Sequence, residues 1–560
     1  MTKNLVIVES PAKAKTIKKY LGKDFEVMAS YGHVRDLVPK EGAVDPTRQF
    51  AMRWELIEKN KKHVDAITRA VKKADALYLS TDPDREGEAI SWHLQQLLTE
   101  AGALDGKAVH RSVFYEITKN AVQEAVDNPR EIADELVKAY LARRALDFLV
   151  GFNLSPLLWK KAGLSGASAG RVQSPALRMI CEREEEILAF KPREYWSIDA
   201  QAAKDAANFT AKLTQLGGQK VEQFTVTDVG GAEAAKQKLE RDANGTLVVA
   251  NVEKKQRRRN PSPPFTTSTL QQEAARKLGF GAQRTMRLAQ RLYEGVDFGE
   301  GPVGLITYMR TDSVSLGADA ISEIRSVIGK LYGAAALPDT PRVYKTKSKN
   351  AQEAHEGVRP TSAARTPEEL AGRIEADEHK LYTLIWRRAV ASQMEAAVFD
   401  TVAVDLAAGP GNLFRANGST LLSPGFLAVY RESFDDVSLN PDDDENRLLP
   451  ALEKGDKVRL LAIDTEQHFT EPPPRYSEAS LVKALEEHGI GRPSTYASII
   501  QTLLYKKYCE LVNKRFIPTD LGKIVSRFLT GNFERYVDYG FTAAMEDELD
   551  NISRGEEDWL

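Results

Sequence analysis

The acidic run Asp82–Glu88 constrains the fold more than any other part of the sequence, because it directly follows a short apolar segment. Residues 75–81 read Asp-Ala-Leu-Tyr-Leu-Ser-Thr, which predicts a strand, and a helix is predicted from about Glu88. The run itself reads Asp-Pro-Asp-Arg-Glu-Gly-Glu, so carboxylates alternate along it. They repel one another, and a divalent cation that prefers oxygen ligands, such as Mg²⁺, relieves the repulsion. We therefore expect an α/β domain with a magnesium site at a sheet edge.

A second buried strand is predicted over residues 4–9. Ser10 suits the N-cap of a following helix and Pro11 its first position, and the helix should end near Gly22. Alternation of strands and helices continues over roughly the first 125 residues, which favours a largely parallel sheet. If the two strands are neighbours, Glu9 lies beside Asp82 and Asp84 at one edge of this sheet.

Two simpler explanations exist for the acidic run. One is an EF-hand calcium loop, which needs a glutamate at its twelfth position and a helix before it. Counted from Asp82, the twelfth residue is His93, and the preceding segment is a predicted strand, so the EF-hand is excluded. The other explanation, an acidic loop without a special role, stays open at this point.

The composition excludes several classes of protein. The chain has 560 residues, of which 42% are hydrophobic and 28% charged, as expected for a globular protein of several domains. It has no apolar run of membrane-spanning length, no signal peptide and only two cysteines, Cys181 and Cys509, so we expect a cytoplasmic protein without membrane contact. The net charge of -3 argues mildly against a nucleic-acid protein, but basic residues gather locally in Lys254–Arg259.

Beyond the first domain, the pattern alternates between helical and β-rich stretches. The segment 265–395 should open with a capping box formed by Ser268 and Thr269 with Gln271 and Gln272. A β-rich region interrupted by this helical insertion suggests two β arms that carry a helical domain. The predicted helical stretches are 132–150, 170–190, 265–395 and 475–560, and the β-rich stretches with Gly and Asn turns are 190–255 and 395–465.

Tyr308 lies in the run Ile306-Thr307-Tyr308-Met309-Arg310-Thr311-Asp312-Ser313. A lone tyrosine is usually a core or surface residue, so the tyrosine alone indicates nothing. A tyrosine that attacks phosphorus must lose a proton from a group whose pKa is ordinarily near 10. Arg310 follows two residues later, and a guanidinium can stabilise both a phenolate and the oxygens of a phosphate.

Several segments together resemble the type IA DNA topoisomerases of bacteria. Glu9 with Asp82 and Asp84 is similar to the Toprim domain, which handles phosphodiesters with Mg²⁺ in topoisomerases, primases and some nucleases. Tyr308–Asp312 resembles the active-site tyrosine motif of the family. The similar segments occur in family order from residue 5 to about 555, and they are Glu9–Ile17, Ser168–Ser174, Tyr308–Asp312, Glu353–Thr361, Pro473–Leu481, Gly489–Ala497 and Phe541–Asp550.

The resemblance implies a multidomain α/β and α+β fold, with a Toprim α/β domain, helical domains and β-rich arms that form a toroidal gate. The implied domains are a Toprim domain at 1–130, a helical DNA-groove domain at 131–190 plus 466–560, β-rich hinge arms at 191–262 plus 396–465, and a helical domain with the nucleophilic tyrosine at 263–395.

The resemblance also implies a reaction without ATP. Tyr308 would attack DNA to give a 5′-phosphotyrosine and a free 3′-hydroxyl, and Glu9 would protonate the leaving oxygen. Lys13 and Arg310 would stabilise the transition state, and His355 would bind the phosphate or tune a carboxylate. Strand passage and religation would relax negatively supercoiled DNA. The residues implied to hold Mg²⁺ are Glu9, Asp82, Asp84 and Glu86.

The DNA contacts implied by the family lie on the predicted helices and on the segment that lines a single-strand groove. Arg143 and Asp147 are four residues apart, so an ordinary ion pair within one helix is the alternative explanation for them. Arg171 and Gln173 would read or stack on a base. The full implied set is His33, Arg111, Arg143, Arg144, Asp147, Lys160, Ser168, Arg171, Gln173, Arg310 and Arg492.

The implied partners are single-stranded DNA and negatively supercoiled duplex DNA, bound by a monomer at the nucleoid. The chain ends soon after the last core motif, without the Cys₄ zinc ribbons that often follow in the family. We therefore expect a piece of a longer protein that cleaves single strands but relaxes supercoils poorly. RNA polymerase or other DNA-processing proteins would bind through the missing C-terminal region.

Three other functions remain open from the sequence. A topoisomerase III-like decatenase tends to have Tyr-Pro-Arg-Ser-Asp at the nucleophile and Glu-Lys-Pro at the first motif, whereas this chain has Tyr308-Met309-Arg310-Thr311-Asp312 and Glu9-Ser10-Pro11. A Toprim primase or nuclease would not need Tyr308. A non-catalytic DNA-binding scaffold would tolerate loss of the carboxylates, which are intact here.

Overall fold

The protein forms two compact units. The computed structural model describes residues 4–299, 301–346, 356–434 and 448–560. The first unit comprises Met1–Glu184, Ser262–Gln393 and Arg475–Leu560, and the second comprises Glu185–Pro261 and Met394–Pro474. The four domain boundaries expected from the sequence stay a prediction.

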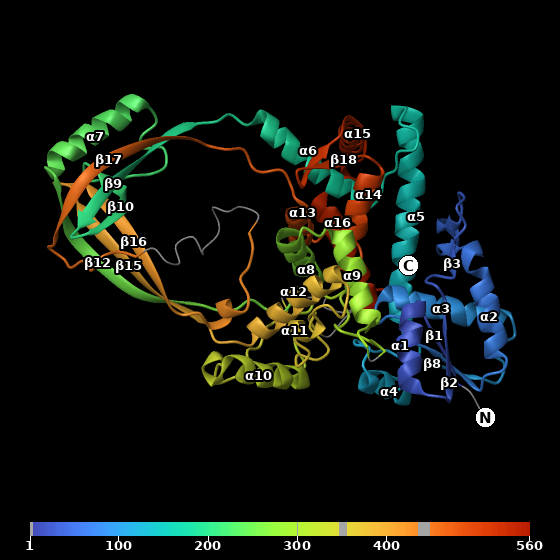
Figure 1. Ribbon diagram of the computed structural model, residues 1–560. Helices are drawn as coiled ribbons and strands as arrows, with labels where there is room; N and C mark the ends of the chain where they lie inside the picture. Colours follow the sequence, from blue (N-terminus) through green and yellow to red (C-terminus); the bar gives the residue numbers. More distant parts are fainter. Residues whose placement is uncertain (1–3, 300, 347–355, 435–447) are drawn as a thin grey trace. The chain divides into compact units, whose positions relative to one another are not determined.

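The first unit begins with a four-stranded parallel sheet in the order β2-β1-β7-β8. Its strands β1, β2 and β8 are labelled in Figure 1. The predicted first strand and helix are confirmed: the Ser10 side chain accepts a hydrogen bond from the Lys13 amide, and Gly22 is the C-cap. The elements of this part are β1 (Asn4–Val8), α1 (Pro11–Leu21), β2 (Phe25–Ala29), β3 (Arg35–Leu37), β4 (Val44–Asp45), β5 (Ala51–Met52), β6 (Trp54–Leu56), α2 (Lys61–Val71), β7 (Ala76–Leu79), α3 (Arg85–Glu100), β8 (Ala108–Arg111) and α4 (Lys119–Asp127).

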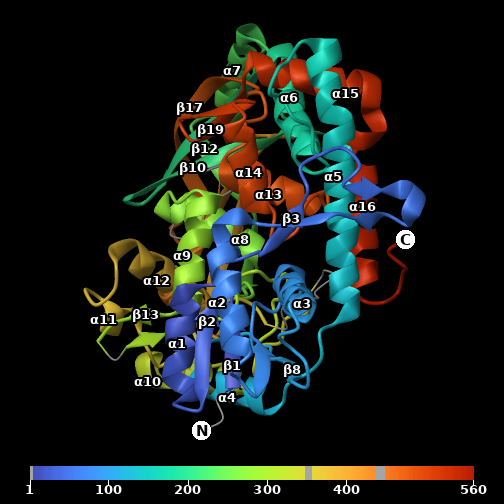
Figure 2. The same ribbon diagram turned by 90° about the vertical axis from the view of Figure 1, so that its right-hand side faces the viewer.

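Helices follow in the same unit, and the long α5 runs beside α16 (Figure 2). A buried apolar cluster joins α5 and α6 to α13, α14 and α15. α14 begins at Tyr496. The elements are α5 (Asp134–Ala162), α6 (Gln173–Ala189), α13 (Glu478–Glu487), α14 (Tyr496–Tyr505), β18 (Cys509–Val512), β19 (Arg515–Pro518), α15 (Asp520–Val537) and α16 (Tyr539–Ser553).

The remaining part of the first unit carries Tyr308. Its first helix is capped by Thr266, which forms a capping box with Thr269, so the box predicted at Ser268 was two residues late. Tyr308 lies outside the helices, in an irregular segment after β14. The elements are α8 (Thr267–Glu273), a π-helical turn (Ala274–Leu278), α9 (Ala282–Glu294), β13 (Val296–Asp297), β14 (Pro302–Val303), α10 (Ala318–Tyr332), α11 (Pro367–Leu370) and α12 (Ala376–Ser392).

The second unit is an antiparallel sheet in the order β11-β10-β16-β15-β12-β17-β9. β9 also pairs with β10, so the two ends of the sheet meet. The helix α7 lies against β9 and β17, and its Ala235 and Leu239 join the apolar core of the sheet (Figure 1). The elements are β9 (Glu194–Lys204), β10 (Ala207–Leu216), β11 (Gln219–Lys220), α7 (Val229–Ala243), β12 (Thr246–Arg259), β15 (Ala397–Ala407), β16 (Leu413–Ser423) and β17 (Lys457–Phe469).

Across the described ranges, no helix has both the length and the apolar character that a membrane crossing requires.

Candidate active site

Glu9 and Asp82 meet at the carboxyl edge of the parallel sheet. β1 and β7 are hydrogen-bonded neighbours, with Leu5 opposite Leu77, so the residues that follow the two strands emerge side by side. The buried Lys13 ammonium lies between the carboxylates, with its Nζ 2.9 Å from Glu9 Oε1 and 2.9 Å from Asp82 Oδ1. The sequence predicted the meeting of the two acids but not the lysine bridge.

Among the groups of this cluster, Glu9 is the carboxyl that favours the protonated form. Burial raises the pKa of Glu9 well above its usual value, and the charge of Asp82 raises it further. Burial is the largest single influence on Asp82 and acts to raise its pKa, but the Lys13 ammonium, hydrogen bonds with Glu9 and Lys13 and the charge of Arg310 together shift the pKa downward. Burial alone would lower the pKa of Lys13, and the two carboxylates raise it instead. These shifts favour a proton on Glu9, a carboxylate on Asp82 and an ammonium on Lys13.

Asp84 connects the Toprim-like sheet to the tyrosine. Its Oδ1 accepts the Gly87 amide at 2.8 Å, which starts α3 at Arg85, three residues earlier than the sequence suggested. Its Oδ2 accepts the Tyr308 hydroxyl at 2.6 Å and the Arg310 Nη1 at 3.0 Å. This one carboxylate therefore fixes both the helix start and the phenol.

Gly87 has a steric reason to be glycine. A Cβ atom at this position would lie 2.1 Å from the carbonyl oxygen of Asp82, which is main chain and cannot move aside cheaply. The acidic run therefore needs a glycine at position 87, because the start of the helix lies so close to the main chain at the end of the strand.

Main-chain bonds place Tyr308. The Tyr308 amide donates to the Tyr115 carbonyl at 2.7 Å, and the Thr307 amide donates to the Arg359 carbonyl at 2.9 Å. An ion pair of 3.0 Å between Arg359 and Glu116 lies at the same junction. The junction therefore joins the end of the Toprim-like part to the tyrosine segment.

The phenol is enclosed and protonated in this state. The Tyr308 side chain is 1% exposed, and its ring packs edge-on against Tyr293 with the ring centroids 5.2 Å apart. Burial and then the negative charge of Asp84 raise the pKa of Tyr308 well above its usual value, and Arg310 acts in the opposite direction. A DNA strand can reach this hydroxyl only after the surrounding residues move.

The predicted magnesium ligands are not assembled into one cluster. Within the described ranges, no group of three or more His, Cys, Asp or Glu side chains is arranged to hold a metal ion. Glu86 instead contacts His33 Nε2 at 3.3 Å and Arg143 Nη1 at 3.4 Å. Burial would raise the pKa of Glu86, but His33 and Arg143 lower it to about 2. The oxygen donors suit Mg²⁺, whereas their placement does not, because protein cations and the phenol occupy them.

Arg111 is fully buried in the described state, so the DNA contact predicted for it would need a rearrangement and stays a prediction. It ends β8 with 0% of its surface exposed. Its guanidinium bonds Glu88 Oε2 at 3.0 Å and the carbonyl oxygens of Thr81 at 2.9 Å and Asp82 at 2.7 Å. Arg111 therefore holds the chain at the end of β7, just where the acidic run begins.

Arg171 and Arg492 face protein carboxylates rather than an open groove. Arg171 is 4% exposed and binds Asp147 at 3.0 Å and Glu546. Arg492, 9% exposed, binds Asp550 at 2.8 Å. In the described state neither guanidinium is free for a base or a phosphate, so both assignments need a rearrangement that exchanges these carboxylates.

The other predicted DNA contacts lie at or near the surface. On α5, Arg144 binds Asp36, and Arg143 lies 3.8 Å from Asp147, so the ordinary ion pair within the helix is present. Lys160 is exposed. The predicted contacts that are partly exposed are His33, Arg143, Arg144, Asp147, Ser168, Gln173 and Arg310, and His355 lies outside the described residues.

Sequence reasoning missed the buried acids that organise these arginines. Glu546 and Asp550 are four residues apart on α16, so they share one face, and both are buried. Glu88 likewise binds Arg111 and Arg130 from a fully buried position. The i,i+4 spacing of acids in Phe541–Asp550 was the available signal, but their partners are distant in the chain.

Comparisons with known proteins agree with this site. A family model described as DNA topoisomerase matches residues 131–560, and one described as Toprim domain matches residues 4–117. DNA topoisomerase 1 of Xylella fastidiosa (strain 9a5c) is 64% identical over 561 residues, covering 100% of this chain and 69% of that protein. DNA topoisomerase 1 of Rickettsia felis is 54% identical, covering 99% of this chain and 71% of that protein.

The fold has a solved counterpart in full-length topoisomerase I from Thermotoga maritima. The TM-score is 0.84 at 37% sequence identity, covering 99% of this chain and 87% of that chain. A Toprim domain whose carboxylates face a buried tyrosine defines an enzyme that breaks and rejoins DNA strands. The chain belongs to the type IA DNA topoisomerase family. It is thus an isomerase, and its family is consistent with transient cleavage of one DNA strand and relaxation of supercoiled DNA.

Proposed function

We propose that Tyr308 is the nucleophile and that Asp84 accepts its proton. The observation that carries this proposal is the 2.6 Å hydrogen bond from the Tyr308 hydroxyl to Asp84 Oδ2, beside Arg310. The phenol oxygen forms a bond to a backbone phosphorus, and the bond from phosphorus to the 3′ oxygen breaks. The products are a 5′-phosphotyrosine and a 3′ end.

Glu9 supplies the proton for the leaving 3′ oxygen. Its raised pKa favours the protonated form, and Lys13 lies beside it to stabilise the developing negative charge. In religation the same groups act in reverse: Glu9 takes the proton of the 3′-hydroxyl, the 3′ oxygen attacks phosphorus, and Tyr308 leaves and recovers its proton from Asp84. His355 is proposed as a phosphate contact from the family motif alone.

Mg²⁺ is the proposed ion of the Toprim domain, a fold that generally binds metal. Asp82, Asp84 and Glu86 carry suitable oxygen donors, and a bound ion would supply positive charge for aligning the 3′ end. Because their oxygens now bind protein cations and the phenol, binding would have to replace these partners. Calorimetric titration of Mg²⁺ into the parent protein and an Asp82→Asn variant would show whether the site exists without DNA.

The proposed substrate is a single DNA strand, such as underwound DNA exposes, bound by a monomer at the nucleoid. We propose contacts from the partly exposed side chains named above, together with Lys160. Arg171 and Arg492 would join them only after leaving their carboxylates. Arg111 would likewise have to leave Glu88 and the main-chain carbonyls that bury it before it could contact DNA.

Trapping the covalent complex tests the nucleophile. An oligonucleotide labelled at either end is mixed with the protein, the reaction is stopped with detergent, and the adduct is located by peptide mapping. We expect the label 3′ of the break to stay on Tyr308, and Tyr308→Phe to give no adduct.

The matched control is Tyr293→Phe, which alters a neighbouring tyrosine that is also fully buried. This variant should still form the adduct. An adduct in Tyr308→Phe, or one mapped to another residue, would refute the assignment.

A further inference from the structure

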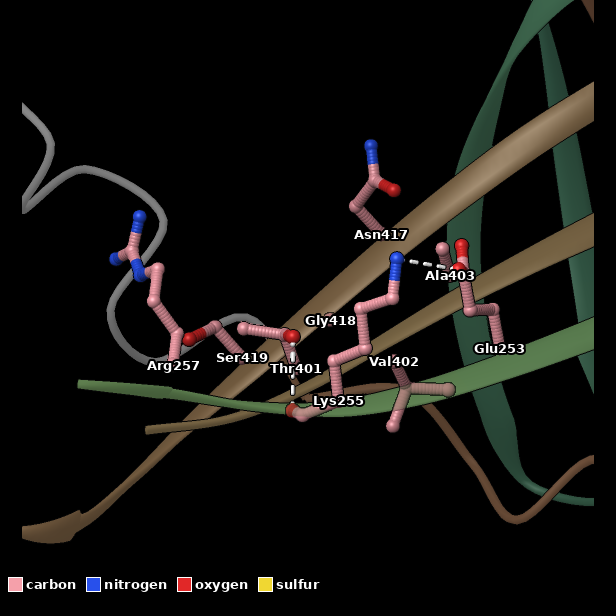
Figure 3. Close-up of a pocket in the computed structure, with 9 residues that line it drawn as sticks. All are labelled: Glu253, Lys255, Arg257, Thr401, Val402, Ala403, Asn417, Gly418 and Ser419. Carbon is pink, nitrogen blue, oxygen red and sulfur yellow. Dashed lines mark hydrogen bonds and ion pairs between the residues drawn. The ribbon is translucent and has the colours of Figure 1, made fainter. Parts of the chain in front are cut away.

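A row of polar side chains crosses three strands of the second unit (Figure 3). Lys255 on β12 is opposite Thr401 on β15, which is opposite Ser419 on β16. Asn417 lies two residues before Ser419 on the same strand, so it shares the face. These side chains lie on the face opposite Val404, which belongs to the apolar core.

The Ser419 hydroxyl in this row lacks a hydrogen-bond partner within the described part of the chain. The residue is only 7% exposed, so water cannot readily solvate the hydroxyl. A buried polar group without a hydrogen-bond partner lowers stability, and such groups are rare in native proteins. Ser419 lines the same hollow as Lys255, so a ligand oxygen in the hollow could accept the hydrogen bond that the Ser419 hydroxyl lacks.

The hollow also carries positive charge. It has a volume of about 240 Å³ and is lined by Lys255, Arg257 and Asn417, among others. Arg257 packs over the Phe399 ring, 5.1 Å from its centroid, and in the described residues it has no carboxylate partner. Its guanidinium is thus available to an anion.

The carboxylate of Glu253 also lines the hollow. Glu253 binds Lys255 Nζ at 2.5 Å and Arg415 at 3.3 Å. The side chains of Glu253 and Lys255 are 42% and 70% exposed, and exposed ion pairs contribute little, so Lys255 can exchange its partner for a ligand anion. Arg415 would still compensate the charge of Glu253.

We propose that this face binds the phosphodiester backbone of a DNA strand, at a site separate from the one that holds Tyr308. Lys255 and Arg257 are two residues apart, which is about 6.8 Å along an extended strand. Cations spaced along a strand suit a polymer with repeated charges better than one small anion. The Ser419 and Thr401 hydroxyls and the Asn417 amide provide neutral donors between the charges, so binding should be independent of sequence.

Disulfide trapping tests the site directly in the full chain. Asn417→Cys places a thiol on the exposed side chain beside the hollow, while the native Cys181 and Cys509 are both buried. A single-stranded circle carrying thiol-tethered phosphates should form a disulfide with this variant. Gln237→Cys, on the exposed side of α7, is the control and should trap at least tenfold less DNA.

Competition experiments distinguish a site for the DNA backbone from a site for free inorganic phosphate. Excess unmodified oligonucleotide should abolish trapping at position 417, and inorganic phosphate at the same phosphate concentration should not. Stronger competition by inorganic phosphate would overturn the proposal in favour of a small-anion site. Equal trapping at positions 417 and 237 would overturn it altogether.

Salt dependence gives an independent readout that does not require the engineered thiol. Removing two phosphate contacts with Lys255→Ser plus Arg257→Ser should reduce the slope of log affinity against log salt by about 1.4 for a long single strand. The control pair Lys220→Ser plus Arg241→Ser removes the same charge from exposed positions of the same unit and should leave the slope unchanged. Equal slopes for both pairs would refute the site.

Cleavage of a short oligonucleotide by Tyr308 is measured in parallel for every variant. It should stay at the parental rate, because the two positions lie in a different unit from Tyr308. Failure of the proposed nucleophile would thus appear in the cleavage assay, and failure of the second DNA site would appear only in trapping and salt dependence.

Discussion

Replacing Arg111 by methionine distinguishes a structural arginine from a DNA contact. The guanidinium makes five hydrogen bonds, one to Glu88 and four to main-chain carbonyls that include those of Thr81 and Asp82. Removing one partner of a buried ion pair costs about 3–5 kcal/mol. Glu88 keeps Arg130 and the Ala133 amide, so we expect the lower end, about 3 kcal/mol.

Hydrogen exchange measured by mass spectrometry localises this loss. A change of about 3 kcal/mol corresponds to roughly a hundredfold increase in local opening, and it should appear in peptides that cover β7 and β8. The salt dependence of oligonucleotide binding should not change, because Arg111 neutralises no phosphate. Normal protection combined with a shallower salt slope would refute the structural role and restore the DNA contact.

Three further predictions concern the active site and its supports. Because the pKa of Glu9 in the folded protein lies above the usual 4.5, its contribution to stability is present at low pH and lost as the pH rises through the folded pKa, and the rate of single-turnover cleavage should decline over the same range. A Glu9→Gln variant should cleave slowly, and a decline of its cleavage rate with pH like that of the parent protein would contradict the role of Glu9 as the acid. Gly87→Ala should displace the Asp82 carbonyl and abolish cleavage, whereas Gly531→Ala, with open space around it, should cleave normally; equal rates would exclude the steric argument. Arg171→Gln leaves two carboxylates without their shared cation and should destabilise the protein by about 3–5 kcal/mol in thermal unfolding, which an unchanged melting temperature would disprove.

The strand ends were predictable from the sequence because their signals are local. Apolar runs followed by Glu9 and by Asp82 define where each strand stops, and a parallel sheet brings such ends to one edge. The start of α3 was misplaced by three residues because the capping side chain, Asp84, is itself part of the acidic run.

The environment of the arginines could not be predicted. Arg171 binds Glu546, which is 375 residues away in the chain, and no local pattern relates the two. Arg111 ends a strand, and alternation alone does not say which neighbours its side chain meets. A motif that resembles a DNA contact in sequence therefore carries no information about burial.

The irregular segment around Tyr308 was also beyond local reasoning. The sequence placed Tyr308 in a mostly helical domain but did not indicate that its own segment is irregular and is held by main-chain bonds to Tyr115 and Arg359. Such a segment has no periodic pattern of its own, because its hydrogen bonds are made to distant main-chain atoms.

That main-chain attachment fixes the backbone at position 308 independently of the side chain that the position carries. The amide of residue 308 donates to Tyr115 whatever side chain it carries, proline excepted. A cysteine or serine placed at position 308 would keep the same main-chain hydrogen bond near Asp84. Its shorter side chain would leave a gap where the phenol ring now lies against Tyr293. The main chain thus sets the position of residue 308, and the side chain alone sets its chemistry.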